Sequence, residues 1–142
     1  MERLKKDEIL EILSTFKCSK DEFWLVSSSA LVLRGIFPDA GDIDMAVTDK
    51  GLEELKNNYD LKPKGRGWYQ VTDNIECVCD GPMEELKYHP EIACDYYVQN
   101  IEEYYYEYLK TSTREKDIAR IPIVEEYIKT RKWNNEISNC WW

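Results

Sequence analysis

Two aspartates one residue apart, Asp42 and Asp44, are the side chains in this sequence best placed for chemistry. Apolar and polar residues alternate over residues 42–47, with the period of a β-strand. On a strand the two carboxylates point to the same side, with about 6 to 7 Å between their Cα atoms, so both can bind the same metal ions. About one such triplet is expected by chance in a chain this rich in aspartate, so the neighbouring elements must distinguish a metal site from a solvated strand end.

A turn rich in serine precedes the aspartate pair. The sequence predicts a short apolar strand over residues 23–27 and a short helix over residues 29–34. Backbone N–H groups at the start of a helix bind anions, and the hydroxyls of Ser27, Ser28 and Ser29 are further donors. Capping the helix requires only one of these serines. We therefore expect the turn to contact phosphate groups.

A third carboxylate is expected on a later strand. The sequence predicts strands over residues 68–71 and 75–79, joined by a turn at residues 72–74, as in a β-hairpin. Glu76 lies in the second of these strands and is the first candidate for the third metal ligand. Asp73, in the turn, is the second candidate.

These segments resemble the core of the polymerase-beta-type nucleotidyltransferase superfamily. The family pattern is a Gly-Gly or Gly-Ser pair at a strand-to-helix turn, an acidic-x-acidic pair and a third acidic residue on a later strand. Ser28, Asp42, Asp44 and Glu76 take these places, within residues 24–36, residues 41–47 and the later strand. Ser27 stands where the family usually has its first glycine, and a side chain there disfavours a positive φ.

A second segment, Arg114 to Asp117, resembles the Arg-x-Lys-Asp sequence of small bacterial and phage nucleotidyltransferase-like proteins. These include proteins of toxin-antitoxin and abortive-infection systems. The resemblance implies that a nucleoside monophosphate passes from a nucleoside triphosphate to an acceptor hydroxyl, with two Mg²⁺ ions as cofactor. The residues implied as catalytic and metal-binding are Asp42, Asp44 and Glu76, and those implied to bind the nucleotide are Ser27, Ser28, Ser29, Lys110 and Arg114.

An alternative of a different class fits the same residues. A catalytically degenerate nucleotidyltransferase fold can serve as a binding module, such as an antitoxin or an inhibitor that presents an acidic surface to a basic protein. The missing glycine at Ser27 and the net charge favour this alternative, whereas the three carboxylates favour the enzyme.

The remaining segments read mainly as helices. Amphipathic helices are predicted over residues 3–16 and 51–59, and helical stripes fill the C-terminal part, residues 101–132. Pro122 should kink the second stripe or start a new helix, and residues 63–67 should end the helix predicted over residues 51–59. The expected fold is α/β (α+β): one mixed sheet of four to five strands flanked by helices, in a single domain over residues 1–142.

The composition limits the partners. The 142 residues carry 19 basic and 28 acidic side chains, for a net charge of −9, so extended nucleic acid is disfavoured as a partner. A triphosphate can still bind, because metal ions cancel local charge. The chain has no run of roughly 20 apolar residues and no apolar stretch at its start, so we expect a cytoplasmic protein that does not enter the membrane. Five cysteines without zinc-ligand spacing are expected to be reduced thiols.

Overall fold

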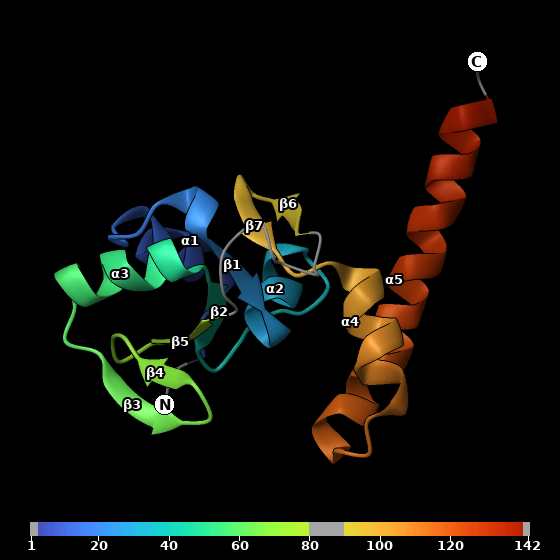
Figure 1. Ribbon diagram of the computed structural model, residues 1–142. Helices are drawn as coiled ribbons and strands as arrows, with labels where there is room; N and C mark the ends of the chain where they lie inside the picture. The colour runs from blue at the N-terminus through green and yellow to red at the C-terminus, as the bar shows by residue number, and fades with distance from the viewer. Residues whose placement is uncertain (1–2, 80–89, 141–142) are drawn as a thin grey trace. The chain divides into compact units, whose positions relative to one another are not determined.

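The computed structural model describes the backbone of residues 3–79 and 90–140, and side chains within those ranges up to residue 131. The chain forms two compact units, Met1–Gln99 and Asn100–Trp142. Figure 1 shows the elements of both units in chain order. Within the described ranges, no helix combines the length and the apolar character needed to cross a membrane.

The first unit is built on a mixed sheet, as predicted. The strands of this sheet lie side by side in the order β3-β4-β5-β2-β1-β7-β6. The pairs β2–β5 and β1–β7 are parallel, and the other neighbouring strands are antiparallel. The strands are β1 (Phe23–Val26), β2 (Ile43–Val47), β3 (Lys62–Gly65), β4 (Trp68–Gln70), β5 (Ile75–Cys79), β6 (Glu91–Ala93) and β7 (Tyr96–Val98).

The described residues thus form seven strands, so the expected four to five is wrong. All four residues of β3 are exposed, so this strand shows no alternation of buried and exposed side chains. It lies in the stretch that was expected only to end the preceding helix. β6 and β7 have three residues each and are joined by Cys94 and Asp95, whose φ values are 53° and 69°. A two-residue hairpin turn with both φ values positive usually contains Asn-Gly, so Cys94-Asp95 offered no turn signal.

Three helices and a 3₁₀ turn complete the first unit: α1 (Lys6–Ser14), η1 (Lys20–Glu22), α2 (Ser27–Leu33) and α3 (Asp49–Asn58). The three α-helices agree with the predicted ranges to within a few residues. Their apolar side chains, among them Ile9, Leu13, Val32 and Leu55, form one core with the sheet. This core fixes which face of each strand points inward.

The core side of β2 determines where the aspartates point. Ile43, Met45 and Val47 are fully buried in the core. Since side chains alternate along a strand, Asp44 points to the opposite side, and Asp42 follows the same alternation one residue before β2. The strand predicted over residues 42–47 is therefore confirmed to within one residue.

The second unit is helical, as expected. It contains α4 (Ile101–Glu107), η3 (Leu109–Thr111) and α5 (Glu115–Cys140). The side chain of Asn100 caps α4 by accepting from the N–H groups of Glu102 and Glu103, both at 3.1 Å. Pro122 lies inside α5, so of the two alternatives the start of a new helix is wrong, and the kink stays a prediction. A proline costs an interior helix one hydrogen bond, and a helix of 26 residues retains many others.

Candidate metal centre

The register of two parallel strands brings the acidic residues together. Asp44 on β2 lies directly opposite Glu76 on β5. In-register residues of neighbouring strands have their side chains on the same face of the sheet. Asp42 precedes Asp44 by two residues and so belongs to the same face.

The three carboxylates of Asp42, Asp44 and Glu76 converge. One oxygen from each lies within 4.8 Å of the others, and all three residues are partly buried. Asp73, the second candidate for the third carboxylate, does not belong to this group. The three residues singled out from the sequence therefore form one cluster, with a geometry in which a cation could be shared.

A lysine that the sequence analysis missed lies at this cluster. Lys64 on β3 forms an ion pair and hydrogen bond with Glu76, whose side chain is 20% exposed. The hydrogen bond to Glu76, together with the charges of Glu76, Asp42 and Asp44, outweighs desolvation and raises the pKa of Lys64. Lys64 is therefore held as an ammonium beside the carboxylates. Only the strand pairing reveals it, because residues 62–65 carry no strand pattern.

The serine turn lies beside the cluster. Val26, the last residue of β1, is directly opposite Asp44, so Ser27 follows at the same end of the sheet as Asp42. Ser27 has a φ of 58°. A serine side chain disfavours a positive φ, yet Ser27 adopts the left-handed conformation that the glycine of the family pattern would take.

Gln99 holds Ser27 in this conformation. Its side-chain Oε1 accepts the Ser27 N–H at 3.0 Å. The Gln99 backbone is fixed on both sides, because its N–H donates to Leu25 O at 2.7 Å and its carbonyl accepts from Arg34 Nη2 at 2.8 Å. Arg34, whose side chain is 5% exposed, also pairs with Glu91 at 2.6 Å. The turn is thus braced by the end of β7 and by β6.

The three serines of the turn have different surroundings. Ser29 is buried, and its hydroxyl lies 3.1 Å from Val26 O and 3.3 Å from Asp44 O. This hydroxyl links the start of α2 to β1 and β2. The phosphate contact expected of Ser29 stays a prediction. Ser27 and Ser28 are partly buried at the start of α2.

A cavity adjoins the carboxylate cluster. Its volume is ≈ 730 Å³. Asp42 and Glu76 line it together with Glu8, Glu11 and Asp73, and none of the described residues that line it is basic. The cavity therefore repels anions unless cations are bound.

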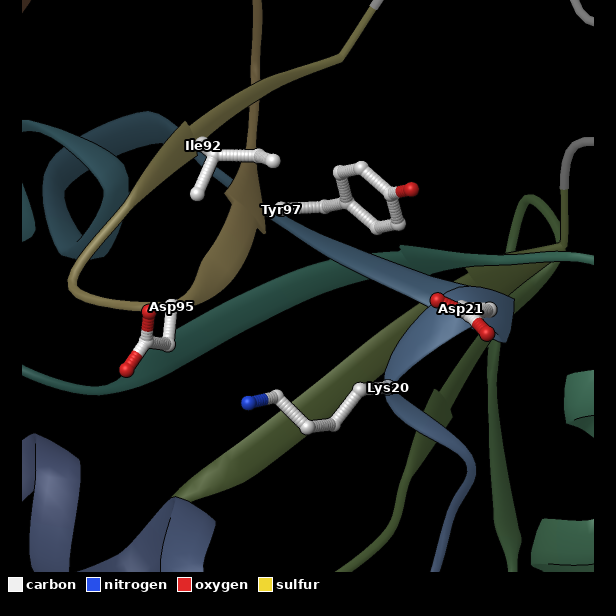
Figure 2. A pocket seen from close by; sticks show the side chains of 5 residues that line it. All are labelled: Lys20, Asp21, Ile92, Asp95 and Tyr97. Atoms are coloured by element: carbon white, nitrogen blue, oxygen red, sulfur yellow. The ribbon is translucent and has the colours of Figure 1, made fainter.

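A second hollow lies away from the cluster. Figure 2 shows its lining side chains, which are Lys20, Asp21, Ile92, Asp95 and Tyr97. Its volume is ≈ 340 Å³, and it lies between η1 and the β6–β7 hairpin. None of the site residues expected from the sequence lines it.

The cysteine next to Glu76 belongs to the core. Cys77 is fully buried on β5, and burial, with a smaller effect from Cys79, raises its pKa to about 11. Burial and then the nearby Glu54 raise the pKa of Cys18 to about 12. Among the described residues, the cysteines carry free thiols.

Lys110 and Arg114, predicted to contact the triphosphate, belong to the second unit. The Lys110 ammonium lies 5.7 Å from the centre of the Tyr106 ring. Arg114 donates to the Tyr108 hydroxyl at 3.1 Å, and its side chain is 66% exposed. Their assignment to the nucleotide stays a prediction.

The segment from Arg114 to Asp117 contains a buried carboxylate. Asp117 is 2% exposed, and its Oδ2 accepts hydrogen bonds from the hydroxyls of Tyr108 and Ser112, both at 2.7 Å. Burial favours the neutral acid, but these hydrogen bonds and the charges of Arg114 and Arg120 outweigh it and lower the pKa of Asp117. This aspartate therefore links α4, η3 and α5 within the second unit.

Comparison with known proteins adds no relative. No family model matches the chain, and neither a curated protein nor a solved structure matches it. The resemblance to nucleotidyltransferases rests on the residues quoted for it and stays a prediction.

Proposed function

We propose that this chain is a Mg²⁺-dependent nucleotidyltransferase, which transfers a nucleoside monophosphate from a nucleoside triphosphate to an acceptor hydroxyl. One observation carries the proposal: the carboxylates of Asp42, Asp44 and Glu76 converge to within 4.8 Å. They do so beside a cavity and next to a strand-to-helix turn whose first residue has a positive φ.

The donor set fits Mg²⁺. All three groups are carboxylates, and hard cations such as Mg²⁺ prefer oxygen ligands. Asp42, Asp44 and Glu76 would hold the proposed pair of ions, whose charge offsets the repulsion among the three anions. When bound, the ions would activate the acceptor hydroxyl and stabilise the charge that develops on the phosphates.

The remaining residues of the site have separate tasks. Ser27 and Ser28 would donate hydrogen bonds to the phosphates, while Ser29 and Gln99 keep the turn in place. One of the two aspartates would accept the proton of the acceptor hydroxyl. The pyrophosphate leaves as the new phosphodiester or phosphate ester bond forms.

The acidic cavity restricts the acceptor. Glu8, Glu11 and Asp73 surround the space next to Asp42 and Glu76, which disfavours long polyanions there. We therefore propose an acceptor other than extended nucleic acid, in an enzyme that acts in the cytoplasm. Lys110 and Arg114 remain proposed contacts of the triphosphate.

Calorimetry with ATP, GTP, CTP and UTP, each with and without Mg²⁺, tests the proposal. The unmodified protein should bind at least one nucleotide only when Mg²⁺ is present, and Asp42→Asn combined with Asp44→Asn should abolish this binding. The control, Asp21→Asn combined with Asp60→Asn, removes the same charge from two exposed positions and should bind like the unmodified protein. Absence of metal-dependent binding for all four nucleotides contradicts the proposal.

The binding module remains the second candidate. It is favoured by the ion pair of Lys64 with Glu76, in which a cation of the chain itself already offsets part of the acidic charge. Such a module, for instance an antitoxin, would present its acidic surface to a basic protein. It predicts that neither the unmodified protein nor the Asp42→Asn, Asp44→Asn variant binds nucleotides.

A further inference from the structure

Lys64 reaches the carboxylate cluster from an irregular position in β3. The pairing of β3 with β4 shifts between Pro63 and Gly65, so that Lys64 and Gly65 are accommodated opposite Trp68. Such a β-bulge redirects a side chain, and bulges are frequent next to functional sites. At this bulge the Lys64 ammonium pairs with Glu76, two strands away in the sheet.

A regular lysine of the same strand provides a comparison. Lys62 lies opposite Gln70, which in turn lies opposite Glu76, so these three residues form one row across the sheet. The ion pair with Glu76 nevertheless comes from Lys64. The contact with Glu76 therefore belongs to Lys64, at the register shift, and not to the lysine in the regular part of β3.

The charges at the cluster explain what this contact does. Three carboxylates within 4.8 Å repel one another, and one ammonium offsets a third of their charge. The Lys64 side chain is 43% exposed, so it can exchange its partner for water at modest cost. Lysine suits this task because it is a compact charge on a flexible stem.

We infer that Lys64 is a built-in counter-cation that holds Glu76 in the metal-free protein and competes with metal ions for that carboxylate. The inference rests on the proposed function, because it requires that Asp42, Asp44 and Glu76 bind a metal. Metal binding then displaces the ammonium from Glu76. Lys64 thereby lowers the affinity of the site for divalent cations.

Titration with Mg²⁺ and with Mn²⁺, without nucleotide, tests the inference by calorimetry. Lys64→Gln should bind both ions about three- to tenfold more tightly than the unmodified protein, because no internal cation has to be displaced. Lys64→Arg, which keeps the charge, and Lys62→Gln, which removes one charge from the same strand, should stay within about twofold. Far-UV circular dichroism establishes that each variant is folded.

The outcomes separate this inference from the proposed function. If the unmodified protein binds metal and Lys64→Gln binds it equally or more weakly, the inference is wrong while the metal site stands. Equal tightening by Lys62→Gln also overturns it, because the effect would then be one of net charge. If none of the four proteins binds metal, both the inference and the proposed function fail.

Discussion

Ser27 holds a left-handed backbone conformation, with a φ of 58°, at the junction of β1 and α2. For a residue with a side chain this conformation costs roughly 1–2 kcal/mol, which the contact with Gln99 helps to offset. Its neighbour Ser28 has a negative φ. The two serines therefore respond differently to the same substitution.

Ser27→Gly should raise the free energy of unfolding by up to about 1 kcal/mol, because relief of the backbone strain exceeds the extra entropy of glycine in the unfolded chain. Ser28→Gly, which removes the same atoms from a helical position, should lower it by about 1 kcal/mol. Urea unfolding followed by tryptophan fluorescence measures both. Equal losses for the two variants would show that the conformation of Ser27 is not strained.

The residues of the candidate site differ in how far they could be predicted from the sequence. Asp42, Asp44 and Glu76 lie on strands with apolar neighbours at a spacing of two, so their common face could be predicted. Lys64 could not, because its contact with Glu76 joins two strands that are separated by β4 in the sheet. The hydrogen bond from the Ser29 hydroxyl to Asp44 O is likewise a tertiary contact, which the local sequence pattern does not predict.

At the scale of elements, Asp117 links three helical segments of the second unit. Its pKa is lowered from the usual 3.8, so its carboxylate stabilises the folded state above pH 3.8, and this contribution is lost as the pH falls through the lowered folded pKa. Asp117→Asn should cost about 2–4 kcal/mol at pH 7, because the buried Arg120 loses the attraction of the Asp117 charge.

The pH dependence distinguishes charge from packing. The difference in stability between the unmodified protein and Asp117→Asn should be constant from pH 7 to about pH 4 and should shrink below that, as measured by urea unfolding at each pH. Glu107→Gln, which changes an exposed carboxylate of α4, should have little effect. A difference that persists unchanged at pH 2 would mean that shape alone, and not the charge of Asp117, stabilises this unit.

A helix or strand could be predicted where the spacing of its apolar residues and its length both indicated the same type of element. β1, β2, β5, α1 and α3 follow from apolar side chains that the core requires. β3, β6 and β7 are short and partly or fully exposed, and they are specified by pairing with neighbouring strands more than by their own residues. Tertiary pairing of this kind accounts for the underestimated strand number.

At the scale of the whole molecule, part of the acidic charge lies where the proposed chemistry would take place, in a chain with a net charge of −9. Five acidic side chains line the cavity beside the cluster, and Asp44 adds a sixth carboxylate next to it. Such a concentration of charge destabilises a folded protein unless cations offset it. Lys64 offsets part of this charge, and the proposed metal ions would offset more.

Anomalous diffraction from crystals grown with Mn²⁺ and a non-hydrolysable nucleoside triphosphate tests the metal site most directly. Manganese accepts the same oxygen ligands as magnesium and is located by its own scattering. We expect an anomalous peak in coordination contact with Asp42, Asp44 and Glu76, with Lys64 displaced from Glu76 and the phosphates beside Ser27 and Ser28. Crystals that contain the nucleotide elsewhere, or no manganese at these three carboxylates, would contradict the account.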